Sequence, residues 1–173
     1  MTAIRDFNNE IDTWIIELEK YSFTQLTAKA SPTSWSLGQV YMHVIGQTEY
    51  YVEQILSCVS NNNNSQDEMS ANGKALFKNN GFPDEIIEGP STNADTLQPV
   101  SKEELMLHLL KVKETVNHAT ALISDNSFAG KTKHPGLHYF NANEWLKFTE
   151  MHLRHHQRQK RRIDGYLNTR QVS

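Results

Sequence analysis

The stretch WLKFTEMHLRHHQRQKRRI, residues 145–163, carries the strongest signal for the fold. Its large apolar residues and its histidines recur every three or four positions, a spacing that puts them on one face of an α-helix. The members of this face are Trp145, Phe148, His152, His155 or His156, Gln159 and Ile163. Histidines and a glutamine thus occupy the middle, where a plain bundle would have leucine. Burying an imidazole costs free energy unless its nitrogens have partners. The pattern therefore predicts that something binds these nitrogens.

Three other segments show the same helical periodicity. Ser36 with Gln39, and Ser101 with Glu104, have the spacing of a capping box, which marks the start of a helix. The four expected helices cover Ile4–Leu18, a segment from Ser34–Ser36 to the run Asn61–Asn64, a segment from Ser101 to Ile123, and a segment from Asn141 to about Leu167.

The connections complete the prediction of the fold. Residues 61–100 form one long connection, in which Ser65–Glu68 could cap a short helix that runs through Phe77. The rest of it is expected to be irregular because of Pro83, Gly89, Pro90 and Pro99. Ser127–Tyr139 is expected to be a loop, and no strand alternation is evident. We therefore predict an all-α fold, a four-helix bundle with a long crossover connection, in a single domain of residues 1–173.

Composition excludes several classes of function. The chain has 173 residues, 38% of them hydrophobic and 21% charged, which is typical of a globular protein. Its net charge of -3 argues against nucleic acid as a partner, and the basic residues of 154–162 are expected to form a solvated helix face. A lone cysteine, Cys58, and the lack of a signal core or long apolar run predict a cytoplasmic protein with no membrane partner.

His152 and His156 are the first candidates for a metal site. Four residues apart, they differ by only about 40° around a helix, and their Cβ atoms lie roughly 5–6 Å apart, so both imidazoles can reach one ion. His155 lies about 100° from His156 and is expected to point elsewhere. His43 lies on a stripe of the second helix with Gln39, Gln47 and Tyr50, and it is the candidate third ligand.

A three-histidine site with open positions is typical of a catalytic centre, because structural zinc sites are usually filled by four protein ligands. Other interpretations remain open at this point. A histidine pair on a helix is more often exposed than ligating, and a lone His43 is more often a hydrogen-bonded core residue. The remaining histidines are expected on a helix surface or in loops, and the tryptophans in the core: His108, His118, His134 and His138; Trp14, Trp35 and Trp145.

Two stretches resemble a known family. Trp35–His43, which reads WSLGQVYMH, resembles the entry to the second helix of DinB/YfiT-like proteins, where the histidine binds metal. His152–Gln159, which reads HLRHHQRQ, resembles their last-helix signature, in which the first and third histidines bind metal. The resemblance implies a four-helix bundle with a crossover, a divalent metal ion bound by His43, His152 and His156, and often a homodimer.

The resemblance also suggests an activity, because the family includes S-transferases that use low-molecular-weight thiols such as bacillithiol. We therefore expect a metal-dependent thiol transferase or hydrolase, with a small-molecule thiol and an electrophile as its partners and zinc or nickel as its metal. The alternative is a non-catalytic metal- or small-molecule-binding protein of a stress response. Helix phase makes four side chains candidates for contact with the ligands or the substrate: Gln39, Gln47, Tyr50 and Gln159.

Overall fold

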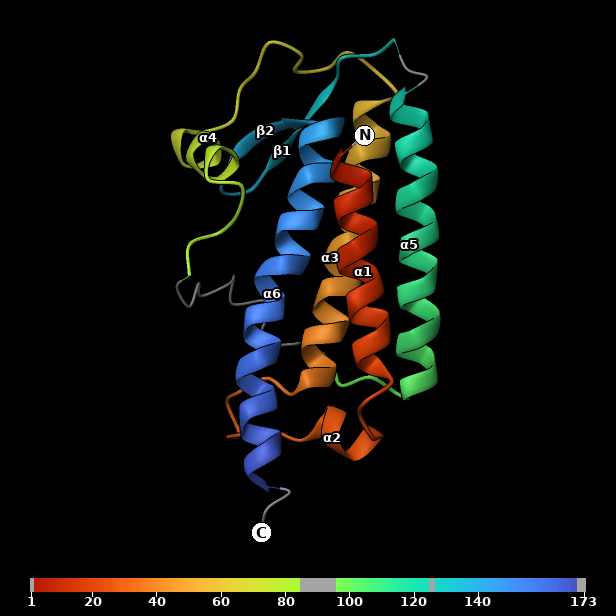
Figure 1. Cartoon of the computed structure of the whole chain (residues 1–173). Helices are drawn as coiled ribbons and strands as arrows, with labels where there is room; N and C mark the ends of the chain where they lie inside the picture. Colours follow the sequence, from red (N-terminus) through yellow and green to blue (C-terminus); the bar gives the residue numbers. More distant parts are fainter. Residues whose placement is uncertain (1, 85–95, 125–126, 171–173) are drawn as a thin grey trace.

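The computed structural model describes residues 2–84, 96–124 and 127–170. These residues form six helices and one two-stranded antiparallel sheet (Figure 1). In chain order the elements are α1 (Thr2–Leu18), α2 (Phe23–Thr27), α3 (Leu37–Cys58), α4 (Ala71–Lys78), α5 (Lys102–Ser124), β1 (Lys131–His134), β2 (His138–Asn141) and α6 (Ala142–Arg170).

The four long helices form the predicted bundle, so the all-α prediction is confirmed. Each of α3 and α1 packs against both α5 and α6, which places α1 and α3 on one diagonal of the bundle. Figure 1 shows that α3 and α5 run in the same direction, opposite to α1 and α6. The connection between α3 and α5 must therefore run back along the length of the bundle, which is the predicted crossover. Gly89 and Pro90 of that connection lie outside the described residues.

The local signals for helix starts are also found in the structure. Ser36 Oγ accepts a hydrogen bond from the Gln39 backbone N–H, and Gln39 Oε1 accepts one from the Ser36 N–H, both at 3.1 Å. Asn141 and Glu144 make the same reciprocal pair at the start of α6, at 2.9 and 2.7 Å. These caps satisfy backbone donors that the first turn of a helix leaves free. They fix where α3 and α6, the helices that carry the three histidines, begin.

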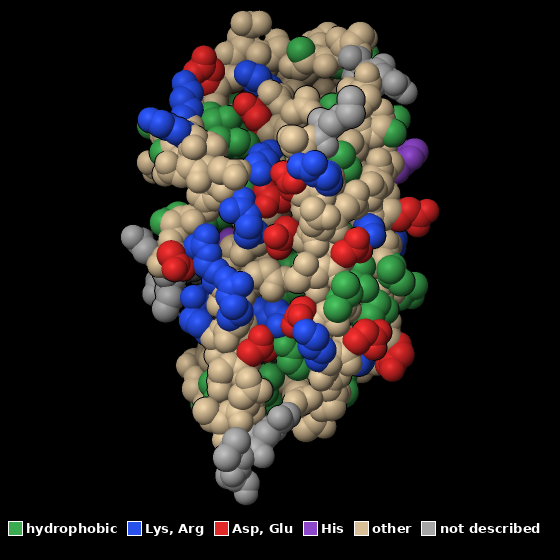
Figure 2. All heavy atoms as spheres, in the orientation of Figure 1, with side chains coloured by type: hydrophobic (Ala, Val, Ile, Leu, Met, Phe, Trp, Pro, Cys, Tyr) green, Lys and Arg blue, Asp and Glu red, His purple; other side chains and the backbone are tan. Residues whose placement is uncertain are grey.

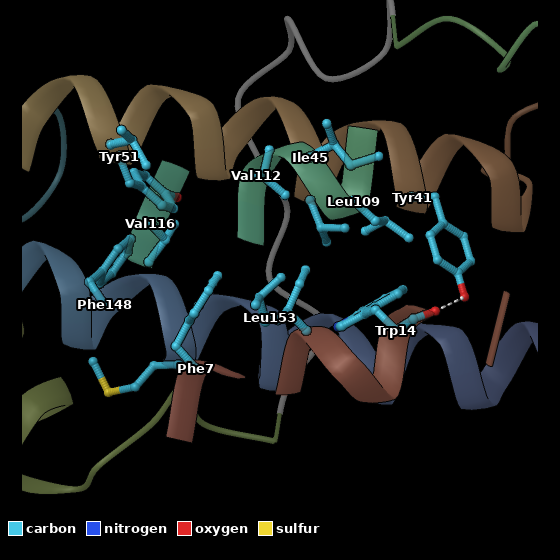
Figure 3. Close-up of a cluster of buried hydrophobic side chains, with 14 of the residues drawn as sticks. Phe7, Trp14, Tyr41, Ile45, Tyr51, Leu109, Val112, Val116, Phe148 and Leu153 are labelled. Carbon is cyan, nitrogen blue, oxygen red and sulfur yellow. Dashed lines mark hydrogen bonds between the residues drawn. The ribbon is translucent and has the colours of Figure 1, made fainter. Parts of the chain in front are cut away.

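The core lies between the four long helices (Figure 3). Trp14 of α1 is fully buried and meets the ring of Tyr41 from α3 edge to face, with ring centroids 5.0 Å apart. The Tyr41 hydroxyl donates to the backbone oxygen of Trp14 at 3.0 Å, so the buried polar group has a partner. The rest of the cluster comes from all four helices and includes Phe7, Ile45, Leu109, Val112, Val116, Phe148 and Leu153.

Two short elements differ from the expectations. The helix α2, which Ser22 and Gln25 cap, was not expected. The short helix of the long connection begins at Ala71 with Ser70 as its N-cap, and not at Ser65–Glu68. Ser70 Oγ accepts from the Gly73 N–H at 3.1 Å. A serine in a turn-rich stretch offers several equivalent cap positions, and contacts with other segments select among them.

The loop expected over Ser127–Tyr139 instead contains the hairpin of β1 and β2, whose strands pair from Lys131–Asn141 to His134–His138. Each strand has four residues, too few for alternation to stand out in a sequence. Phe140 is fully buried, and the Trp145 Nε1–H donates to Thr132 Oγ1 at 2.7 Å. The hairpin therefore lies against the start of α6.

None of the helices within the described ranges is both long enough and apolar enough to cross a membrane.

Candidate metal centre

Three imidazoles from two helices of the bundle come together. His152 and His156 lie one turn apart on α6, and His43 lies on α3, which packs beside α6. One ligand nitrogen from each lies within 4.8 Å of the other two. The Nε2 atoms of His152 and His156 are 3.1 Å apart. The expectation that His152 and His156 can reach one ion from the same helix face therefore agrees with this spacing.

The spacing of the α6 pair suits one ion. Two nitrogens at 2.0–2.1 Å from a tetrahedral zinc ion lie about 3.3 Å apart. The 3.1 Å between the two Nε2 atoms is close to this value. His43 approaches from the facing helix, with its ring centroid 5.2 Å from that of His152 and 4.7 Å from that of His156. The donor set is therefore three nitrogens, which fits zinc, nickel and related divalent ions.

Burial keeps these imidazoles neutral. His152 and His156 are each only 8% exposed. Burial lowers the pKa of His43 to about 4 and that of His156 to about 3, with smaller contributions from neighbouring histidines. It also lowers the pKa of His152 well below its usual value. All three side chains are thus unprotonated at neutral pH, the form of histidine that binds a metal ion.

Gln159 fixes the orientation of one ligand. Its Oε1 lies 2.8 Å from the Nδ1 of His156. If Nδ1–H donates to this oxygen, the Nε2 lone pair of His156 is free to face the cluster. His152 has no equivalent partner within the described residues, where its buried Nδ1 makes no hydrogen bond. The contact with Gln159 therefore favours one tautomer of His156, and no such contact does so for His152.

Aromatic rings surround the cluster. Trp35, which precedes α3, lies with its ring centroid 5.1 Å from that of His43. Tyr51 of α3 meets His152 edge to face at 5.5 Å, and Phe148 stacks on His152 at 6.3 Å. Phe82, from the crossover, lies 6.3 Å from His152. These rings exclude water from much of the surface of the imidazoles, which strengthens any electrostatic interaction made there.

A comparison with protein-family models identifies the family. The model of the DinB superfamily matches residues 12–159, well over half of the chain and all three clustered histidines. The chain therefore belongs to the DinB superfamily. Neither the curated proteins nor the solved structures gave a match to it.

The basic residues of this DinB-superfamily chain are not simply a solvated face, as was expected. Arg154 donates from Nη2 to the backbone oxygen of Asn80 at 2.7 Å and pairs with the buried Glu150. Arg158 donates to the backbone oxygens of Phe82 and Pro83 at 3.1 and 2.8 Å. Acidic side chains lie between the basic ones over α6 in Figure 2. Two arginines of α6 therefore hold the crossover, with Phe82, beside the histidines.

Lys160 is the most deeply buried of these basic residues, with its side chain 3% exposed. Its Nζ lies 3.0 Å from Glu17 and 2.8 Å from Asp164, and it donates to the Tyr21 hydroxyl at 2.6 Å. Because these partners come from α1, from the segment after it and from α6, the cluster ties the lower end of α6 to α1. These hydrogen-bond partners all lie outside the histidine cluster, which gives Lys160 a structural role.

The other candidates lie in different surroundings. Gln39 uses its amide to cap α3 and to donate to the Thr96 backbone oxygen at 2.5 Å. Gln47 is half-buried and makes no side-chain hydrogen bond within the described part of the chain. Tyr50 packs against Tyr51 and Trp145. Of the four, Gln159 is the one that forms a hydrogen bond with a clustered histidine within the described part of the chain. His155 is outside the cluster, and its ring lies 4.8 Å from that of Phe82.

Sequence reasoning missed three aromatic neighbours of the site. Trp35 was expected in the core, although it opens the stretch that ends at His43. Phe82 carried no periodic signal because it lies in an irregular connection. His134 was expected on a surface or in a loop, but it lies on β1 with its ring 5.0 Å from that of Phe148. Its Nδ1 accepts from the backbone N–H groups of residues 136 and 137, and burial lowers its pKa to about 4.

We expect Gln159→Leu to weaken zinc binding by roughly 10–100-fold, the usual cost of losing a hydrogen bond that orients a ligand histidine. Competition with a chromophoric chelator measures the affinity. Gln54→Leu, at a half-buried glutamine farther along α3, is the matched control and should leave the affinity unchanged. Equal affinities for the wild type and Gln159→Leu would mean that the contact with His156 does not tune the site.

Proposed function

We propose that this protein is a metal-dependent enzyme that transfers a low-molecular-weight thiol, of the bacillithiol type, to a small electrophile. The observation that carries the proposal is the cluster of three neutral imidazoles without a fourth protein ligand among the described residues. A site with three protein ligands keeps a position for substrate, whereas a structural zinc site is normally filled. Membership of the DinB superfamily supports the same interpretation.

The chemistry requires a thiolate. A free thiol with a pKa near 8.5 is mostly protonated at neutral pH, and the thiolate is the nucleophile. A divalent ion bound at the cluster would supply the positive charge that deprotonates a coordinated thiol. In the transfer, the thiol proton leaves to solvent, the sulfur forms a bond to the electrophilic carbon, and the leaving group departs with its electron pair.

The protein's own residues prepare this step. His43, His152 and His156 provide uncharged donors, so a divalent ion would keep its full positive charge in the site. Gln159 orients His156 through the 2.8 Å contact. Trp35 lies near His43 and Phe82 lies near His152, so apolar rings cover parts of the cluster. An apolar boundary of this kind favours a small electrophile with an apolar body.

The test is thiol conjugation by protein loaded with zinc or nickel. Glutathione, cysteine and bacillithiol are offered as thiols, with 1-chloro-2,4-dinitrobenzene or monochlorobimane as the electrophile, and product formation is followed optically. We expect acceleration that a chelator removes and that His43→Ala abolishes. A panel without metal-dependent turnover would reject the enzyme and favour the alternative, a non-catalytic metal-binding protein.

Cys58→Ser is the control for chemistry on the protein itself, and we expect it to keep its activity. Cys58 lies at the end of α3, about 22 Å from His43 along the helix axis at 1.5 Å per residue. It is buried, and its Sγ lies 3.5 Å from the Phe140 backbone oxygen. Burial raises the pKa of its thiol, which makes it a poor nucleophile. Loss of all activity with metal retained would instead indicate a covalent cysteine mechanism.

The homodimer that the family resemblance implies stays a prediction. Sedimentation velocity on the metal-loaded protein and on the metal-free protein measures the assembly state and shows whether the metal affects it.

A further inference from the structure

A cavity of about 210 Å³ lies beside the histidine cluster, toward the C-terminal end of α6. Seven residues line it: Ala30, Ser34, Trp35, Gln159, Arg162, Ile163 and Tyr166. Two of them also contact the clustered histidines, because Trp35 lies against His43 and Gln159 lies against His156. The cavity and the candidate metal centre therefore share two walls.

The far wall of the cavity is held in place by hydrogen bonds. The Tyr166 hydroxyl on α6 donates to the backbone oxygen of Lys29 at 2.9 Å, which fixes the segment after α2 against α6. Ser31 and Ser34 close a turn in that segment, in which the Ser34 N–H donates to the Ser31 backbone oxygen at 3.1 Å. The Ser34 hydroxyl donates to the same oxygen at 3.0 Å. Because these hydrogen bonds are all within the protein, the wall of the cavity keeps its shape when no ligand is bound.

Two side chains that line the cavity have hydrogen-bond donors with no acceptor among the described residues. Gln159 uses its Oε1 on His156, so the Nε2 group that remains can only donate. Arg162 is also a donor only, and within the described residues it forms no ion pair. By contrast, Arg154, Arg158 and Lys160 each pair with a carboxylate. A positive charge and free hydrogen-bond donors match a ligand group that is negatively charged and accepts hydrogen bonds. A carboxylate fits best, because its two oxygens match the planar guanidinium.

We propose that this cavity binds a carboxylate group of the substrate, held by Arg162 and Gln159, while the reacting sulfur lies at the histidine cluster. The inference rests on the proposed function and adds the substrate class. Arg162 lies six residues beyond His156, about 9 Å along the helix at 1.5 Å per residue. The carboxylate must then be several bonds from the sulfur. Trp35, Ile163 and Ala30 provide an apolar wall for the carbon chain between them.

The experiment measures thiol binding directly on cobalt(II)-loaded protein, where coordination of a thiolate produces a charge-transfer absorption. The two probes are 6-mercaptohexanoate and 6-mercaptohexanol, which differ only in the terminal carboxylate. We expect the wild type to bind the carboxylate thiol at least about tenfold more tightly, as one hydrogen bond to a charged group predicts. Arg162→Gln should remove this preference and leave binding of 6-mercaptohexanol unchanged.

Arg161→Gln is the matched control, because Arg161 is an exposed neighbour that does not line the cavity. It should keep the full preference. Arg162→Lys, which retains charge but loses the planar fork, should keep part of it. Because Arg162 is exposed and outside the core, none of these variants is expected to unfold the protein.

A second arm identifies the source of the carboxylate. With 6-mercaptohexanol present, adipate is titrated calorimetrically into the wild type and Arg162→Gln. Binding of adipate that depends on Arg162 would assign the carboxylate to the electrophile. The cavity would then be a carboxylate site for the electrophile and not for the thiol. Absence of any Arg162 dependence in both arms would overturn it, even if both thiols bind. If neither thiol binds but adipate binding depends on Arg162, the thiol function fails and the carboxylate site survives.

Discussion

His152→Ala is expected to abolish tight binding of zinc or nickel while the bundle stays folded. His152 supplies one of three nitrogens in the cluster, and its Nε2 lies 3.1 Å from that of His156. Removing it leaves two donors from different helices, so we expect the affinity to fall by more than about 100-fold, beyond the 10–100-fold cost of losing an orienting partner. The fold should persist because apolar faces of four helices hold it.

Metal content after dialysis and competition with a chelator measure the loss, and circular dichroism measures the helix content. His118→Ala, at an exposed histidine of α5, is the matched control and should bind metal as the wild type does. Tight binding by His152→Ala would remove this residue from the ligand set. Loss of most helicity on chelation of the wild type would show that the metal is structural, as in zinc fingers.

Trp14→Ala is expected to cause the largest loss of stability, about 3–5 kcal/mol of unfolding free energy, the usual cost of truncating a fully buried tryptophan. Trp14 is 0% exposed and packs edge to face with Tyr41. Its Nε1 makes no hydrogen bond within the described part of the chain, and Tyr41 bonds to its backbone oxygen, which alanine retains. The loss therefore measures the cavity and the ring contact, not a broken hydrogen bond.

Urea denaturation followed by circular dichroism gives the unfolding free energy. Ile16→Ala lies two positions along the same helix, and because Ile16 is 62% exposed its substitution should change that free energy by less than about 0.5 kcal/mol. The folded fraction of Trp14→Ala should still bind zinc, since Trp14 does not belong to the cluster of candidate ligands. A cost below about 1 kcal/mol would mean that the core around Trp14 relaxes to fill the space.

The long helices and the crossover could be predicted because their signals are local. Ser36 with Gln39, and Asn141 with Glu144, cap the helices that the apolar periodicity indicates. The hairpin could not be predicted, because Thr132 and Phe140 contact Cys58 of α3, which lies far away in the sequence. Strand pairs of four residues depend on such distant packing more than on the sequence of the strands.

The candidate site could be predicted only in part. The spacing of His152 and His156 is a local property of one helix, and the resemblance to the DinB family linked them to His43. Phe82 could not be found in this way, since Arg158 brings it to the site from an irregular segment. Arg162 looked like one more basic residue of a solvated helix. Its distinction from Arg154 and Arg158 depends on which carboxylates lie nearby, and sequence does not give this.

The order of residues on α6 has a consequence for how this protein can change over time. His152 and His156 alternate along the helix with Arg154 and Arg158, so one short segment both faces the candidate metal site and holds the crossover. Inserting or deleting a single residue there would turn everything beyond it by about 100° around the axis. The pair of imidazoles and the attachment of the crossover would be lost together. The sequence of this segment can therefore change by substitution, but an insertion or deletion of one residue would not be tolerated.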